Sequence, residues 1–144
     1  MEKGIKLRII LECPTAGVDF GLQKGKGNNY ETIQKQRSAG ERLSFELVLK
    51  VKMADNELPV FLGLFAQGTS QDRFIYIDIG TYAGQKDSPC GRRLKIPLIG
   101  ITSEMIHQML SDTKLMLVTT VPGTGKDGGP NCATVKPFAG WKLL

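Results

Sequence analysis

Apolar and polar residues alternate with a period of two along much of this chain. The alternation is clearest in residues 5–11 and 43–53, where every second side chain is apolar and most of the others are charged or polar. A period of two is typical of a half-buried β-strand. Less regular apolar patterns predict further strands in residues 17–23, 61–65, 74–79, 92–98, 114–121 and 133–141.

Residues 61–98 predict a three-strand meander joined by two glycine-rich loops. The first run, 61–65, is apolar at nearly every position, which is typical of a strand covered on both faces. Residues 24–29 contain no apolar side chain and predict a turn or open loop. Residues 30–42 are polar and fit either an extended edge strand or an irregular loop.

One helix is predicted, over about residues 102–111. Thr102 is a suitable N-cap, and Ile101 and Ile106 occupy the two positions of a hydrophobic staple. Met105, Ile106, Met109 and Leu110 form one apolar stripe at helical spacing. His107, the single histidine of the chain, lies beside that stripe and is expected at the surface.

About eight short strands and a single helix define the expected fold class. The pattern predicts a mainly β protein, an antiparallel β-sandwich or partly closed barrel, in which residues 1–144 form a single domain. The chain has no internal repeat, linker or low-complexity tail that would divide it.

Composition narrows the class of protein. The longest apolar run is far shorter than the roughly 18 to 20 residues of a membrane span, and residues 1–14 lack the cleavage site of a signal peptide. Three cysteines at wide spacing, with no C-x-x-C pair, predict neither a disulfide framework nor a zinc site, and a reducing cytoplasm suits them. The net charge of +5 is spread along the chain, so charge alone assigns no partner.

Several long motifs carry a resemblance to a known family. They are a Q-G-x-x-x-x-R-F-x-Y run from Gln67 to Tyr76, Gly80 with Ala83-Gly84, an R-R-x-K-x-P-L run from Arg92, and a P-G-x-G-x-D-G-G-P-x-C-A-T run from Pro122. On these motifs the chain resembles a family of small bacterial proteins of unknown function. The resemblance implies a bacterial cytoplasmic domain and supplies no activity, cofactor or catalytic residue.

The strongest candidate site combines cationic and aromatic residues around the second and third runs of the predicted meander. If 74–79 and 92–98 pair antiparallel, Tyr76 and Asp78 face Arg93 and Lys95 on one side of the sheet. Guanidinium groups beside phenols and a carboxylate suit a small anionic or polar ligand. The candidate residues are Arg73, Tyr76, Asp78, Tyr82, Arg92, Arg93 and Lys95. The alternative is a ladder of cross-strand ion pairs on a solvated face.

A second, weaker candidate is an anion-binding loop formed by Gly125, Lys126, Asp127 and Gly128. It departs from a phosphate-binding Walker loop, because Thr120 and Asp127 stand where that motif needs a glycine and a serine or threonine. Consecutive glycine amides can still hold an anion, and a wide hairpin loop is the alternative interpretation.

These observations favour a binding module for a small polar or anionic ligand that has no cofactor or metal. An enzyme of unrecognised type at the same loops and a protein-interaction module using a sheet edge remain as alternatives, and the balance lies against an enzyme. Nucleic-acid binding ranks lower, since aromatic residues are 7% of the chain and most occupy expected core positions. No membrane association is expected.

Overall fold

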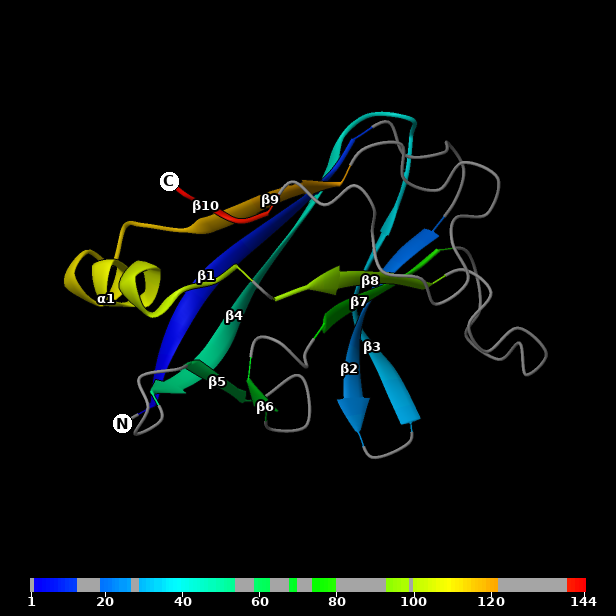
Figure 1. Cartoon of the computed structure of the whole chain (residues 1–144). Helices are drawn as coiled ribbons and strands as arrows, with labels where there is room; N and C mark the ends of the chain where they lie inside the picture. The colour runs from blue at the N-terminus through cyan, green and yellow to red at the C-terminus, as the bar shows by residue number, and fades with distance from the viewer. Residues whose placement is uncertain are drawn as a thin grey trace.

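The structure is a computed structural model, and it describes residues 2–12, 19–26, 29–53, 59–62, 68–69, 74–79, 93–98, 100–121 and 140–144. Within these ranges the chain forms ten strands and one helix, arranged as two sheets (Figure 1). The expected fold class, a mainly β sandwich with one helix, is confirmed.

The larger sheet has six strands in the order β10-β9-β1-β4-β5-β6. Its central pair is β1 and β4, which run antiparallel over their whole length. The strands are β1 (Glu2–Leu11), β4 (Leu43–Met53), β5 (Pro59–Leu62), β6 (Gly68–Thr69), β9 (Leu117–Val121) and β10 (Lys142–Leu143).

The smaller sheet has four antiparallel strands in the order β3-β2-β7-β8. They are β2 (Asp19–Lys26), β3 (Asn29–Arg37), β7 (Phe74–Ile79) and β8 (Arg93–Pro97). β3 lies at one edge of this sheet and β8 at the other, so β2 and β7 are its inner strands.

One hydrophobic core lies between the two sheets. The alternating apolar positions of β1 and β4 point into it, as do those of β2 and β7: Ile5, Leu7, Ile9, Leu11, Phe20, Leu22, Phe45, Leu49, Ile75 and Ile77 are all buried. The helix α1 (Ser103–Ser111) adds Ile106 and Met109 to this core. Figure 1 shows α1 at one end of the sandwich, away from β2 and β3.

The start of α1 follows the sequence prediction. The Thr102 hydroxyl accepts a hydrogen bond from the backbone N–H of Met105 at 3.2 Å, as expected of an N-cap. Leu110, predicted in the apolar stripe, is 40% exposed. The buried residues of the helix are Ile106 and Met109.

The predicted three-strand meander is wrong in its first strand. β5 pairs with β4 in the six-stranded sheet, whereas β7 and β8 pair with each other in the four-stranded sheet. β5 follows β4 after a short connection, so it continues the sheet that β4 already belongs to. Residues 63–67 and 70–73 lie outside the described part of the chain.

Other boundaries also differ from the prediction. β2 continues to Lys26 and β3 begins at Asn29, so the predicted turn at 24–29 is mostly strand. Residues 29–37 form an edge strand, which settles the choice left open for 30–42. One ladder among the described strands is parallel rather than antiparallel: β9, which follows α1, lies beside β1 and runs in the same direction.

Side chains join the two sheets where β3 passes β4. β5 pairs only with Lys50–Met53 of β4. The preceding part of β4 instead accepts hydrogen bonds from side chains of β3. The Gln34 and Gln36 amide nitrogens donate to the backbone oxygens of Glu46 and Ser44, at 2.8 and 2.7 Å. These contacts stand in for a strand ladder at this corner of the sandwich.

Candidate functional site

Four of the predicted ligand-binding residues lie in described strands. Tyr76 and Asp78 are on β7, and Arg93 and Lys95 are on β8. The expected antiparallel pairing is confirmed, with Tyr76 opposite Lys95 and Asp78 opposite Arg93. Arg73, Tyr82, Arg92 and the predicted anion loop at Gly125, Lys126, Asp127 and Gly128 lie outside the described residues.

The outer surface of β7 carries two aromatic residues and one carboxylate. Ile75 and Ile77 are fully buried in the core, so the alternate residues Phe74, Tyr76 and Asp78 belong to the opposite face of the sheet. All three are partly exposed. The rings of Phe74 and Tyr76 lie side by side, with centroids 6.4 Å apart and planes inclined by 39°.

β2 provides a close-packed strip next to these side chains. Gly21 lies opposite Asp78, and Gln23 lies opposite Tyr76. The Gln23 amide nitrogen donates to the Thr32 hydroxyl at 2.7 Å and to the Gly21 carbonyl oxygen at 3.2 Å. A Cβ on residue 21 would lie 3.0 Å from Thr32 Cγ2 and 3.1 Å from Gln23 Nε2, so a glycine at this position lets both side chains pack against the strand.

β3 adds two cationic side chains that the sequence prediction missed. Lys35 lies opposite Gly21, and Arg37 lies opposite Asp19. Asp19 Oδ1 is 3.3 Å from Arg37 Nη1, and Asp19 Oδ2 is 3.7 Å from Lys35 Nζ. The Asp19 side chain is only 13% exposed, whereas those of Lys35 and Arg37 are 61% and 67% exposed. The two cations therefore stay open to solvent while they share one carboxylate.

We call the resulting surface the cationic face. It is the outer side of the four-stranded sheet and comprises Asp19, Lys35, Arg37, Phe74, Tyr76, Asp78, Arg93 and Lys95. Basic residues occupy both edge strands, and the aromatic residues lie on the inner strand β7. Four basic residues against two acidic ones give this face a positive balance.

A signal for the strand that carries Lys35 and Arg37 was present in the sequence. Residues 34–37 read Gln-Lys-Gln-Arg, an alternation of amide and cation with the period of a strand. The inward positions hold glutamines that bond to β4, so a search for apolar periodicity passes over this strand.

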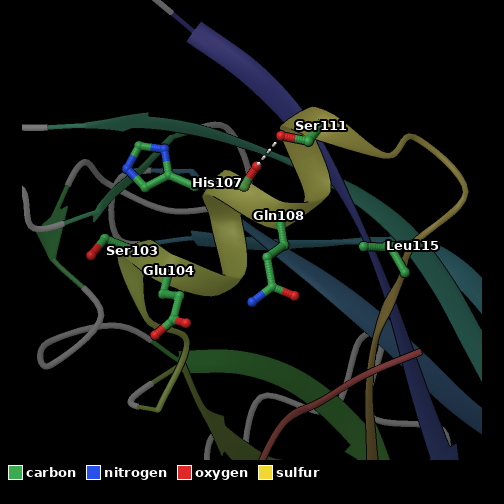
Figure 2. Close-up of a pocket in the computed structure, with 6 residues that line it drawn as sticks. All are labelled: Ser103, Glu104, His107, Gln108, Ser111 and Leu115. Carbon is green, nitrogen blue, oxygen red and sulfur yellow. Dashed lines mark hydrogen bonds between the residues drawn. The ribbon is translucent and has the colours of Figure 1, made fainter.

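A separate, shallow depression lies on the exposed side of α1. Its lining residues are Ser103, Glu104, His107, Gln108, Ser111 and Leu115 (Figure 2). His107 is exposed, as predicted. The Ser111 hydroxyl donates to the backbone oxygen of His107 at 3.1 Å, and Figure 2 shows the imidazole ring turned away from it. Activation of a serine requires a hydrogen bond to the base itself, so these two residues do not form a nucleophile–base pair.

No group of three histidine, cysteine, aspartate or glutamate residues in the described ranges is arranged to hold a metal ion. Among the same residues, no helix is long and apolar enough to cross a membrane.

The fold and the site define the class of protein: a two-sheet β-sandwich with one helix and a cationic, aromatic-bearing sheet face. The comparison with protein families then gives the family. A model of DUF5990, a family of unknown function, matches residues 5–144, and the chain belongs to this family. The resemblance to a family of unknown function is thus confirmed. No curated protein and no solved structure matches the chain.

Proposed function

We propose that this protein is a binding module whose cationic face holds a small anionic ligand. The observation that carries the proposal is the register of the four-stranded sheet. It brings Lys35 and Arg37 from one edge strand, and Arg93 and Lys95 from the other, to the same face as Tyr76. These cations come from segments about 60 residues apart in the chain, so the fold assembles them.

The side-chain chemistry suits an oxyanion. Guanidinium groups bind carboxylates and phosphates through two parallel N–H···O bonds, and ammonium groups act as point charges beside them. On the β3 side the two cations reach solvent through long side chains, and Asp19 holds them near each other. An anionic ligand would compete with Asp19 for these groups.

The alternatives receive less support from the described residues. A nucleophilic enzyme would need a nucleophile hydrogen-bonded to its base, and among the described residues Ser111 and His107 of α1 do not form such a pair. Strand addition at the β3 edge is disfavoured, because Glu31, Lys35 and Arg37 are exposed there and charged edges resist pairing. We further propose a bacterial cytoplasmic setting, because the chain resembles a family of small bacterial proteins and its three widely spaced cysteines suit a reducing compartment.

The test measures thermal stability with added inorganic phosphate, pyrophosphate or citrate at constant ionic strength. A ligand that binds only the folded state stabilises it by RT ln(1 + [L]/Kd), so Tm keeps rising with the logarithm of the ligand concentration above Kd. We expect Arg93→Gln with Lys95→Gln to reduce this rise, because the variant removes the cations of one of the two edge strands. The matched control is Lys50→Gln with Lys52→Gln, which removes two exposed lysines from the other sheet and should keep the rise. Equal responses of the two variants would overturn the proposal.

A further inference from the structure

The aromatic residues of the cationic face lie where a flat ligand ring would contact them. Phe74 and Tyr76 lie on β7, which is an inner strand of the four-stranded sheet. Their rings are adjacent and partly exposed, with centroids 6.4 Å apart. Tyr76 is partly buried and also contacts residues of the core. Aromatic side chains on the open face of a sheet are surfaces on which nucleobases stack.

The cationic residues flank this aromatic pair on both sides. Lys95 is the direct neighbour of Tyr76 on β8, and Lys35 lies two strands away from β7 on β3. Adjacent strands are about 4.8 Å apart, so the backbones that carry these cations run about 5 and 10 Å from that of β7. Strands that carry cationic residues therefore flank a ligand ring on β7 in either direction.

From this juxtaposition we infer that the anionic ligand of the cationic face is a nucleotide. The base stacks on Phe74 and Tyr76, and the phosphate binds to the cations of β3 or β8. The inference rests on the proposed function, because it assigns a chemical class to the ligand of the same face. It adds a requirement that a simple anion site does not have, namely a planar ring in the ligand.

A free mononucleotide and a single-stranded nucleic acid share this chemistry. The two sources differ in how affinity depends on length and salt. A strand gains contacts as successive bases and phosphates engage the sheet, and its affinity falls steeply as salt displaces it. A mononucleotide engages one ring and one phosphate and depends on salt only weakly.

The test compares binding of AMP, ribose 5-phosphate and inorganic phosphate to the whole chain by isothermal titration calorimetry. Stacking of one base is worth on the order of 1–3 kcal/mol, which corresponds to a preference for AMP over ribose 5-phosphate of about fivefold or more. In the variant Phe74→Leu with Tyr76→Leu, which keeps apolar side chains at both positions, we expect this preference to disappear. Binding of ribose 5-phosphate should stay unchanged.

The outcomes separate the two proposals. Equal affinities for AMP and ribose 5-phosphate would overturn the nucleotide inference and leave anion binding intact. Binding of none of the three phosphates would overturn both. If the double leucine variant fails to fold, the comparison of ligands on the unaltered protein still decides the inference. An oligonucleotide of about eight nucleotides separates the two sources of the ligand. If it binds more tightly than AMP and its affinity falls steeply with salt, the ligand is a single strand. If it binds no more tightly than AMP, the ligand is the free nucleotide.

Discussion

The side-chain amide of Gln34 donates a hydrogen bond to the backbone oxygen of Glu46, 2.8 Å away on the other sheet. Gln36 makes the same contact with Ser44, at 2.7 Å. Both acceptors lie on the part of β4 that β5 does not pair with. Two glutamines on β3 therefore satisfy backbone groups that a neighbouring strand would otherwise bond, and they hold β3 in the position from which Lys35 and Arg37 reach the cationic face.

Removing both amides is expected to weaken this corner of the sandwich. Gln34→Ala combined with Gln36→Ala loses two hydrogen bonds, each worth about 0.5–1.5 kcal/mol, so the free energy of unfolding should fall by about 1–3 kcal/mol. Urea denaturation followed by circular dichroism measures the change. Glu31→Ala, an exposed position on the same strand, is the control and should stay within about 0.5 kcal/mol of the parent. A double variant as stable as this control would show that the two bonds contribute nothing.

The same contacts explain why the sequence leaves two alternatives for β3, an edge strand or an irregular loop. A strand is recognised by apolar residues at alternate positions, and on β3 those inward positions hold glutamines. Strands with apolar inward faces, such as β1, β4 and β7, were predicted close to their observed bounds. Periodicity therefore reports burial in the core and misses a strand whose inward side chains bond to another backbone.

Sheet membership is a second feature that local pattern does not determine. The apolar run that contains β5 was assigned to the strands that follow it, although it pairs with the strand before it. Both arrangements bury the same side chains, so the pattern is the same in each. In the candidate site, the pairing of Asp78 with Arg93 was predictable because β7 and β8 are consecutive and antiparallel. The contribution of Lys35 depends on the position of β3 two strands away, which no local pattern contains.

A second prediction concerns the close approach of Val48 to Gly4 on the outer side of the six-stranded sheet. A Cβ on residue 4 would lie 2.8 Å from Val48 Cγ1, closer than the two atoms can pack. Gly4→Ala should therefore force the valine from its rotamer, at a cost of about 0.5–1.5 kcal/mol. In a Val48→Ala background the obstacle is gone. Gly4→Ala should then raise the free energy of unfolding by about 0.4–1 kcal/mol, because alanine lowers the conformational entropy of the unfolded chain.

A double-mutant cycle by urea denaturation measures the effect of Gly4→Ala on the free energy of unfolding in both backgrounds, where we expect opposite signs. Val48 is 63% exposed, so its own replacement removes little buried surface and serves as the background. The same effect of Gly4→Ala in both backgrounds would mean that Val48 is not the obstacle.

A third prediction concerns the buried tryptophan that ties the chain's end to the smaller sheet. Trp141 is 5% exposed, and its indole N–H donates to the backbone oxygen of Pro97 on β8 at 2.9 Å. Trp141→Phe keeps an aromatic ring and leaves that oxygen without its donor, so the free energy of unfolding should fall by about 1–3 kcal/mol. Circular dichroism is the measurement, because the variant lacks the fluorophore. Leu144→Ala, at a 69% exposed position nearby, should be near neutral, and equal losses in the two variants would contradict the role given to the indole.

The last prediction uses the competition between Asp19 and a ligand for the cations of β3. Asp19→Asn removes the carboxylate charge that Lys35 and Arg37 share, at 3.7 and 3.3 Å, so both cations become available to an anion. Ion pairs with such exposed partners are each worth about 0.2–1 kcal/mol, and phosphate or AMP should bind about two- to fivefold tighter. Calorimetric titration measures the gain. Glu46→Gln, which removes one carboxylate from the pair with Arg8 on the other sheet, changes net charge equally and should leave the affinity unchanged. If Glu46→Gln tightens binding as much as Asp19→Asn does, the gain reflects net charge alone, and the ligand does not use the β3 cations.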